Sequence, residues 1–415
     1  MSAAPSPIIS ILGGGVSGIT AGIVVQLLGG QSHLYAAHRA DTAWGSHRPQ
    51  MASLYPAASV IPHRVTVGDV TAHMRDTQAC FEVLRRSGTC GVRLQRHFEV
   101  FETPPSPPDY ADAVHAFRML PDDGSGGAHV PRRPGAEAVF GWTFQAYVVE
   151  TPTYLRRLFA LYQMLGGRIT TRLVSADTLP DVPGEVLVNA LGAGSRSIFP
   201  DSRPAAFLRG CLLLANPPRP VTMPGPVPLA SYNYTPSASV YPTATGDAGG
   251  LYLYPRTDTW VLGGSARPGT LTDAGDWSGA PLAGPTCTVD GQAIPQAVLE
   301  TNAAIIRNWA GVDIRRWPMR ATYGIRYVRD PEGDGVRLDV TSAHGRRVVH
   351  CHGHGGAGVT LSWSSALRVA RRLRSEGGLL PAPDRVGQPA ASALLPADAV
   401  LVRRLFQQVR TRLQE

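Results

Sequence analysis

The chain has 415 residues and a formal net charge of +8, and all 39 of its basic residues are arginine. Without lysine there can be no pyridoxal-phosphate Schiff base, no amine nucleophile and no P-loop lysine, which excludes three large groups of enzymes. The length predicts two or three domains, and a hydrophobic content of 43% is ample for a large core. Arginine is spread along the chain without a run of five like charges, so we expect no nucleic-acid partner.

Cysteine usage and the N-terminal region predict a cytoplasmic protein. The five cysteines are odd in number and scattered, and they show no C-x-x-C spacing, which disfavours a disulfide framework and a structural zinc site. The apolar stretch from Ile8 to Leu28 lacks a basic flank and is interrupted by glycines. We therefore expect neither a signal peptide nor a membrane span there.

The first forty residues predict a strand–helix–strand unit, with strands at Ile8–Leu12 and Ser32–Ala36 and a helix at Val16–Leu28. The turn between strand and helix reads Gly13-Gly14-Gly15-Val16-Ser17-Gly18 and satisfies G-x-G-x-x-G. In this motif Gly13 permits the tight turn, Gly15 lets the backbone approach a pyrophosphate, and Gly18 allows close helix packing. The context indicates a dinucleotide site rather than a turn without a ligand.

The end of the second strand lacks the acidic residue that usually holds the ribose hydroxyls, because Ala37 stands there and the first acid is Asp41. His38 and Arg39 are candidates to contact phosphate or adenine instead, with a solvated loop as the alternative for each.

The middle of the chain predicts a change of architecture. Pro104 to Pro134 is rich in Pro, Gly and Asp and is expected to form surface loops. A helix capped by Thr151 should run to Gly166. Strands are then expected at residues 169–174 and 185–190, returning to the first sheet, and at 208–215, 250–254 and 260–264 in an antiparallel or mixed sheet.

The C-terminal third restores the strand–helix pattern with a strand at residues 347–350 and a helix at 364–374. A Pro- and Ala-rich linker then leads to a basic amphipathic helix, Ala397–Leu413, which we interpret as an appendage. The predicted domains are a nucleotide-binding domain of residues 1–56, 148–204 and 322–376, a substrate domain of residues 57–147 and 205–321, and a C-terminal segment of residues 377–415.

A second glycine-rich turn runs from His350 to Trp363. Three histidines at i, i+2 and i+4 invite a metal interpretation, but the intervening glycines make a rigid ligand set improbable and no carboxylate is close in sequence, so we expect no metal. A strand entering such a turn before a helix again aims backbone N–H groups at a cofactor.

These motifs resemble the D-amino-acid oxidase family of flavoenzymes. The turn Gly353-His354-Gly355-Gly356, followed by Gly358, Thr360 and Trp363, looks like the family's C-terminal flavin signature. The segment Gly324 to Arg329 looks like its substrate-arginine segment, and Tyr252-Leu253-Tyr254-Pro255 also matches. The resemblance runs from about Ile8 to Arg374. It implies an α/β fold in which a Rossmann-like FAD-binding domain is interleaved with an α+β substrate domain.

The resemblance implies FAD as the cofactor and assigns residues by position. Arg326 would pair bidentately with a substrate carboxylate, Tyr252 would hydrogen-bond the same group, and the Gly356 carbonyl would receive the substrate amine. The residues implied to cradle FAD are Gly13, Gly15, Val16, Ser17, Gly18, His38, Ser46, His47, Ala52, Ser53, Leu54, Val174, Gly192, Gly355, Gly356, Ala357, Gly358, Val359 and Thr360.

The implied reaction is oxidation of the Cα–N bond of an amino or imino acid, with hydride passing from the α-carbon to flavin N5 and, in an oxidase, oxygen then giving peroxide. The implied partners are a small amino acid, imino acid or amine that carries a carboxylate, molecular oxygen and a second copy of the chain in a homodimer. No membrane partner is expected.

The chain departs from the family pattern at the active-site lid. Ala248 replaces the lid tyrosine, and Tyr232, Tyr234 and Tyr241 look like parts of a rebuilt lid. Ala357 and Cys351-His352 are further departures and suggest a specialised substrate. Two alternatives remain open at this stage: an NAD(P)-dependent dehydrogenase, and a flavin-binding accessory protein without turnover.

Overall fold

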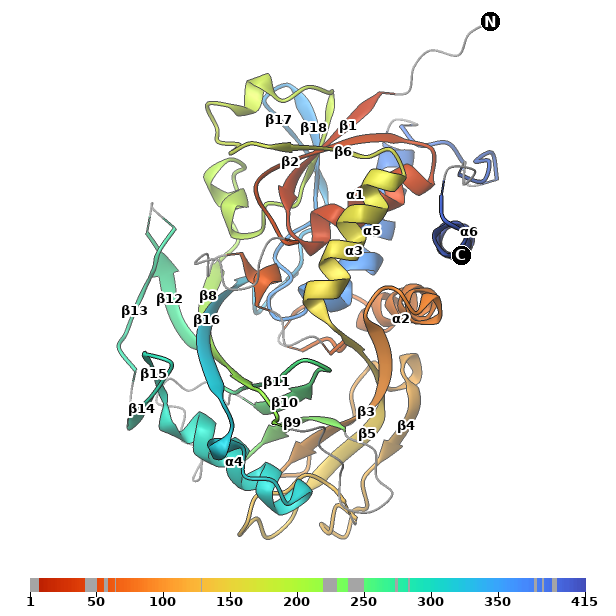
Figure 1. Cartoon of the computed structure of the whole chain (residues 1–415). Coiled ribbons are helices and arrows are strands. Elements are labelled where there is room, and N and C mark those ends of the chain that lie inside the picture. The colour runs from red at the N-terminus through yellow and green to blue at the C-terminus, as the bar shows by residue number, and fades with distance from the viewer. Residues whose placement is uncertain are drawn as a thin grey trace, which may run out of the picture.

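The computed structural model of the chain describes residues 7–41, 51–55, 59–63, 65–127, 129–218, 230–237, 250–272, 275–282, 284–376, 379–382, 384–389 and 394–415. Two β-sheets organise these residues, one in the upper and one in the lower half of Figure 1. Among the described helices, none combines the length and the apolar character needed to cross a bilayer.

The first sheet has six strands in the order β17-β18-β7-β1-β2-β6. Five run parallel, and β17 is antiparallel to β18. The strands are β1 (Ile8–Gly14), β2 (Gln31–Arg39), β6 (Arg168–Thr171), β7 (Val186–Asn189), β17 (Val340–Ala343) and β18 (Arg346–His350). Because the strands of a parallel sheet are covered on both faces, β1 is buried at consecutive residues rather than at alternate ones, as Ile9, Ser10 and Ile11 show.

Five helices share the main core with this sheet. They are α1 (Val16–Leu27), α2 (Val70–Ser87), α3 (Thr151–Met164), α5 (Gly358–Ser375) and α6 (Pro396–Gln414). The opposite face is covered by irregular chain and by the short turns η3 (Leu179–Asp181) and η4 (Gly192–Ser197). The strands expected at residues 169–174 and 185–190 thus do return to this sheet, next to β2 and β1.

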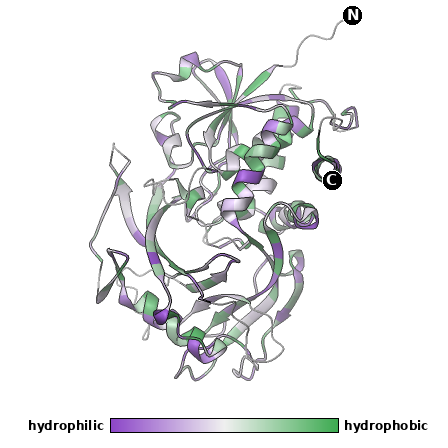
Figure 2. Ribbon diagram, viewed as in Figure 1, coloured by the Kyte–Doolittle hydropathy of each residue, from purple (hydrophilic) through white to green (hydrophobic). Residues whose placement is uncertain are grey.

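The second sheet has ten strands in the order β13-β12-β8-β11-β10-β9-β3-β5-β4, with β16 paired to β8. One face packs on α4 (Gln296–Ala310), a helix on which hydrophobic and hydrophilic residues alternate in Figure 2. The strands are β3 (Val92–Phe101), β4 (His115–Met119), β5 (Phe140–Val149), β8 (Ala205–Ala215), β9 (Ser231–Thr235), β10 (Leu251–Pro255), β11 (Trp260–Gly263), β12 (Arg267–Leu271), β13 (Trp277–Gly279) and β16 (Met319–Arg329). A separate hairpin pairs β14 (Thr286–Val289) with β15 (Gln292–Pro295).

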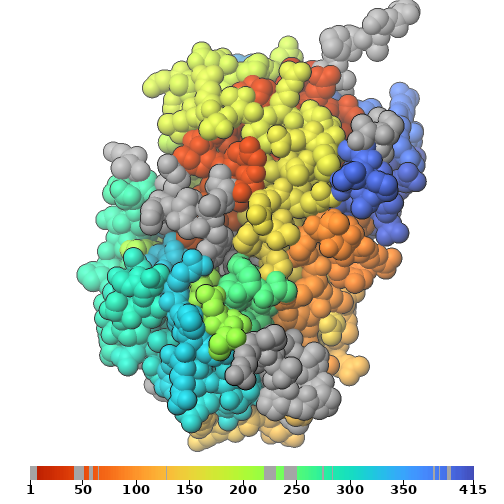
Figure 3. Space-filling view, viewed as in Figure 1, coloured from red at the N-terminus to blue at the C-terminus, as the bar shows by residue number. Residues whose placement is uncertain are grey.

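The structure corrects the interpretation of the C-terminal helix as an appendage. In α6, Leu401, Leu405, Phe406 and Val409 are fully or almost fully buried and belong to the main core. Figure 3 shows this helix, in dark blue, seated against neighbouring segments in yellow and orange. The apolar stripe read as the face of a free amphipathic helix is therefore part of the domain interior.

Three local predictions also need correction. The segment Pro104 to Pro134 is not all loop, because β4 forms an edge strand there and pairs with β5. Thr151 is the first residue of α3 rather than its cap, and its hydroxyl accepts a hydrogen bond from Arg256 at 3.2 Å. Helix α5 begins at Gly358, six residues before the predicted start at Ser364, because the flavin-like turn leads directly into it.

Candidate functional site

The turn between β1 and α1 has the backbone geometry that its glycines predict. Gly13 has a φ of +116°, and a Cβ there would collide with the Ala190 carbonyl group at the end of β7. Gly18 lies directly on the Gly13 carbonyl, so α1 approaches the strand as closely as the motif requires. The Ser53 hydroxyl, from the short turn η1 (Ala52–Leu54), accepts a hydrogen bond from the Val16 N–H at 3.0 Å. This contact brings η1 beside the glycine turn.

The turn between β18 and α5 lies next to the first one and is tied to it by His354. One ring nitrogen of His354 lies 3.4 Å from the Ser17 hydroxyl of α1, and the other lies 3.0 Å from the Ser365 hydroxyl of α5. Burial lowers the pKa of His354 to about 4, so the ring is neutral at pH 7. A histidine that the sequence offered as a metal ligand therefore acts as a neutral bridge between two helices.

Both helices present their N-termini to one cavity. The N-cap residues of α1 and α5, Gly15 and Ala357, provide no side-chain cap, and neither helix has an acidic residue in its first turn. The first-turn N–H groups other than that of Val16, which binds Ser53, and the positive ends of the two helix dipoles therefore favour a bound anion. A dinucleotide pyrophosphate is an anion of this kind.

The cavity has a volume of about 1060 Å³ and is lined by eleven of the residues implied to cradle FAD. These are Gly13, Gly15, Val16, Ser17, His38, Ala52, Ser53, Val174, Gly192, Gly355 and Gly358. Gly18, Leu54 and Ala357 do not line it: Gly18 packs on Gly13, and the other two belong to apolar clusters behind the wall. Ser46 and His47 lie outside the described residues.

His38 and Arg39, the two candidates for a cofactor contact that follow Ala37, differ in whether they line the cavity. His38 lines the cavity, as Ala37 does. Arg39 does not, because its guanidinium forms a bidentate ion pair with Asp41 and lies over the Phe159 ring. His38 is therefore the better candidate for a cofactor contact at this end.

A buried donor without a partner supports the fit of a cofactor. The Ser195 hydroxyl accepts from the Asn189 amide at 2.7 Å and lies 3.1 Å from Nε2 of His352. The other ring nitrogen, Nδ1, has no hydrogen-bond partner among the described residues, although His352 is only 1% exposed. Burial holds the pKa of His352 well below its usual value. Since His352 lines the cavity, a polar atom of the cofactor can hydrogen-bond this nitrogen.

A smaller cavity of about 130 Å³ adjoins the first and shares Val16, Ala52, Ser53, Ile325, Gly355 and Gly358 with it. All three residues expected to handle the substrate line it: Arg326, Tyr252 and Gly356. Val359 and Thr360 also line this smaller cavity rather than the larger one. The hydroxyl of Thr360 is already used, because it donates to the Ile61 carbonyl at 2.8 Å.

Arg326 lies on β16, directly above a glycine of the neighbouring strand. A Cβ at Gly210 of β8 would come within 2.8 Å of an Arg326 guanidinium nitrogen. The guanidinium reaches the Ser265 carbonyl only at 3.5 Å, and among the described residues no carboxylate forms an ion pair with it. Most of its donors are therefore available to a ligand, whereas other arginines, such as Arg329 with Asp201, are paired inside the protein.

Tyr252 lies on β10 and its ring lies over Gly263 of β11, where a larger residue would displace it. The ring stacks on that of Tyr254, with 5.2 Å between the centroids, and both line the smaller cavity. Tyr254 belongs to a motif that the sequence shows, but no function for it was expected from the sequence.

Sequence reasoning also missed the polar face of the second sheet. His97 and Glu99 of β3, Ser231 and Asn233 of β9, and Tyr252 and Tyr254 of β10 alternate with apolar residues that face α4. All six side chains are buried. The signal was present as a period of two, but the sequence alone does not show that the polar face is turned inward.

The expectation of a rebuilt lid is corrected for two of its tyrosines. Tyr232 and Tyr234 belong to β9, are fully buried, and donate hydrogen bonds to Asn302 and Glu102. They are part of the core behind the sheet. Tyr241 and Ala248 lie outside the described residues.

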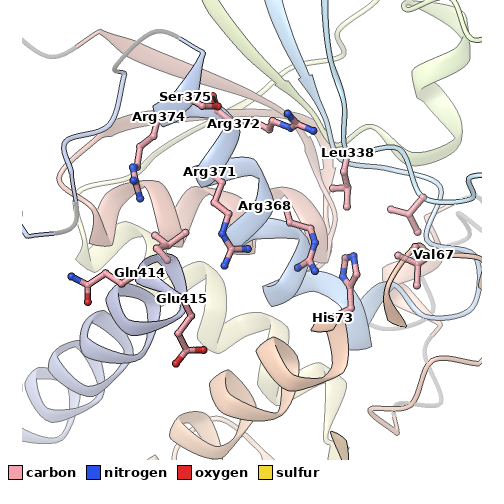
Figure 4. A pocket seen from close by; sticks show the side chains of 13 residues that line it. Val67, His73, Leu338, Arg368, Arg371, Arg372, Arg374, Ser375, Gln414 and Glu415 are labelled. Carbon is pink, nitrogen blue, oxygen red and sulfur yellow. Dashed lines mark hydrogen bonds between the residues drawn. The ribbon is translucent and has the colours of Figure 1, made fainter. Parts of the chain in front are cut away.

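Another hollow, of about 850 Å³, lies between the C-terminal turns of α5 and α6 and the start of α2 (Figure 4). Its wall includes Arg368 and Arg371, and both pair with Asp76 of α2, at 2.9 and 3.9 Å. Arg412 of α6 binds the same carboxylate at 2.8 Å. These charges join three helices, and the hollow shares no residue with the two cavities described above.

Comparison with known proteins agrees with this geometry. The family described as "DAO: FAD dependent oxidoreductase" matches residues 9–372. A D-amino-acid oxidase from Rubrobacter xylanophilus is 28% identical over 87% of this chain and 94% of its own length. A D-aspartate oxidase from Homo sapiens is 26% identical over 88% of this chain and 93% of its own. The structure of a glycine oxidase from Geobacillus kaustophilus aligns with a TM-score of 0.57 at 14% identity, covering 89% of this chain and 95% of the other.

The chain therefore belongs to the DAO family of FAD-dependent oxidoreductases. It is a flavin enzyme with a Rossmann-like cofactor domain, which confirms the family, fold class and cofactor expected from the sequence. A nicotinamide as the resident cofactor is correspondingly disfavoured.

Proposed function

We propose that this flavoenzyme oxidises the Cα–N bond of an amino acid held by its carboxylate in the smaller cavity. The observation that carries the proposal is Arg326, a guanidinium without a carboxylate partner among the described residues, in a cavity that adjoins the cofactor cavity. The curated relatives point the same way, since one acts on D-amino acids and the other on D-aspartate by name.

The chain supplies binding and orientation, and FAD, when bound, supplies the acceptor for the hydride of the Cα–H bond. The planar fork of Arg326 suits a bidentate pair with the substrate carboxylate, and the Tyr252 hydroxyl is placed to hydrogen-bond the same group. The Gly356 carbonyl in the cavity wall is an acceptor for the substrate amine. The substrate loses a hydride and a proton to give an imine, which water hydrolyses to a keto acid and ammonia. Fixing the α-carbon in one position is the protein's main contribution.

We further propose that FAD is not covalently attached. Cys351 lines the cofactor cavity, but burial raises the pKa of its thiol to about 12, so the nucleophilic thiolate is scarce at neutral pH.

All five cysteines are free, and four are buried, which supports the proposed cytoplasmic location. The homodimer and the domain boundaries stay predictions.

Anaerobic mixing of the holoenzyme with D-, L- and N-alkyl amino acids and cyclic imino acids tests the proposal. We expect at least one of them to bleach the flavin absorbance, and a peroxidase-coupled assay in air to detect hydrogen peroxide with that substrate. Methyl esters of the same amino acids serve as controls, because they cannot form the carboxylate pair with Arg326. Bleaching by none of the free acids would refute the proposal.

A further inference from the structure

A row of hydrogen-bonded side chains leads from the smaller cavity to a buried carboxylate. Glu99 of β3 is 7% exposed and lies opposite Asn233 of β9 in the sheet register. The Asn233 amide donates to Glu99 Oε1 at 2.7 Å, and His97 Nε2 lies 3.1 Å from the same oxygen. Among the described residues, no arginine forms an ion pair with Glu99.

The direction of each hydrogen bond in this row of side chains follows from the Glu99 carboxylate, which only accepts. Because the Asn233 NH₂ group faces Glu99, its carbonyl oxygen faces Tyr254 and accepts the proton of that hydroxyl. The single proton of Tyr254 is therefore used inside the protein. Toward the cavity, which Tyr254 lines, its oxygen can only accept.

A tyrosine hydroxyl usually serves as donor or acceptor. Tyr254 presents only lone pairs to a ligand, because Asn233 holds its proton.

The charges around the cavity have opposite signs on different strands. Arg326 lies on β16, and Tyr254 lies on β10 with Glu99 behind it; strands β11 and β8 separate the two walls. Burial and the Glu99 charge raise the pKa of Tyr254, which keeps its hydroxyl protonated. Among the described residues, the titratable groups that line the cavity are Arg326, His63 and the three tyrosines Tyr55, Tyr252 and Tyr254.

We propose that the Tyr254 oxygen, which can only accept, reads the substrate side chain and selects amino acids whose side chain carries a hydrogen-bond donor. Glu99 and Asn233 are positioning residues that fix the direction of the Tyr254 proton. An alkyl side chain leaves the buried Tyr254 oxygen without a donor, and a carboxylate side chain places lone pairs against lone pairs near a like charge. This selection rests on the proposed function, because it assumes that Arg326 holds the α-carboxylate.

The test compares matched substrates in anaerobic flavin reduction by the holoenzyme. The pairs are serine with 2-aminobutyrate, which has a methyl group in place of the hydroxyl, and asparagine with aspartate, in the configuration that reduces the flavin in the general screen. We expect the wild-type protein to prefer serine and asparagine about tenfold or more, through the apparent dissociation constant rather than the limiting rate.

Two variants test the acceptor, Tyr254, and its positioning residue, Glu99, separately. Tyr254→Phe should remove most of the serine preference, and Glu99→Gln should weaken the preference for asparagine over aspartate, because an amide there removes the charge and lets Asn233 turn. Tyr232→Phe is the matched control, since that hydroxyl donates to Asn302 on the opposite face of the same sheet. It should leave both preferences unchanged.

The outcomes distinguish the proposed amino-acid oxidation from the proposed selection of the substrate side chain. Reduction by no amino acid would refute the proposed function and this selection with it. Reduction without preference, or with aspartate ahead of asparagine, would refute the selection alone. The wild-type comparison decides even if a variant fails to fold, and equal losses in Tyr254→Phe and Tyr232→Phe would also count against the acceptor.

Discussion

Replacing Arg326 by leucine tests which group holds the substrate carboxylate. The side chain lines the smaller cavity but not the larger one, and its closest hydrogen-bond acceptor among the described residues is 3.5 Å away. Removing it should therefore disturb neither the cofactor wall nor an internal ion pair. The substitution should act on substrate binding.

The expected magnitude follows from the lost contacts. Two charge-assisted hydrogen bonds to a carboxylate are together worth about 3 kcal/mol, which corresponds to roughly a hundredfold weaker binding. We expect KM to rise by about that factor for every amino acid that reduces the flavin. The flavin absorbance of the purified variant should match that of the wild type.

The assay is steady-state oxidation followed by peroxide formation, with flavin content and Tm measured on the same samples. Arg320→Leu is the matched control, because Arg320 lies on the same strand, is exposed and lines neither cavity. If Arg326→Leu kept the wild-type kcat and KM, Arg326 could not be the carboxylate ligand. Loss of FAD in the variant would instead show that the two cavities are not separable as described.

Three further predictions concern the cofactor and stability. His352→Phe should weaken FAD binding by about 1–2 kcal/mol in fluorescence titration of the apoprotein, because it removes the Nδ1 atom that has no partner among the described residues; an unchanged Kd would exclude that contact. Asp76→Asn should lower the free energy of unfolding by about 2–3 kcal/mol in denaturant titration, with the FAD content unchanged, because three partly exposed arginines share this one buried carboxylate. Surface substitutions usually change the free energy of unfolding by no more than about 0.5 kcal/mol, so a change within that range would mean that the cluster is fully solvated. Stability should fall as the pH drops from about 6.5 toward 4, because the unfolded chain then binds protons on histidines that stay neutral in the fold; a flat Tm over this range would contradict it. Among the described residues, the histidines whose folded-state pKa lies below the ordinary value are His33, His73 (to about 3), His350 and His354 (each to about 4) and His352.

Much of the cofactor domain could be predicted from local sequence. The apolar run Ile8–Leu12, the glycine turn and the following helix are specified by short-range physics, because each glycine answers a backbone constraint within a few residues or at one crossing strand. The second turn before α5 was recognisable for the same reason. Only its connection to the helix was misplaced.

Other features were decided by packing between distant segments. Helix α6 has the pattern of a free amphipathic helix, and only its contacts with α1, α2 and α5 show that its apolar side is core. Tyr232 and Tyr234 look like lid residues in a polar, glycine-rich stretch, yet β9 pairs with β3 and β10 and buries them. Pairing partners far apart in sequence cannot be derived from one strand's composition.

The absence of lysine and the excess of arginine illustrate the same division. Composition alone excluded lysine-based catalysis, and the glycine turns indicated a cofactor. It could not say which of 39 arginines meets a substrate. The tertiary structure decides that, because it pairs many of them with carboxylates, as it does Arg329, Arg368 and Arg412, and leaves Arg326 in a cavity without such a partner among the described residues.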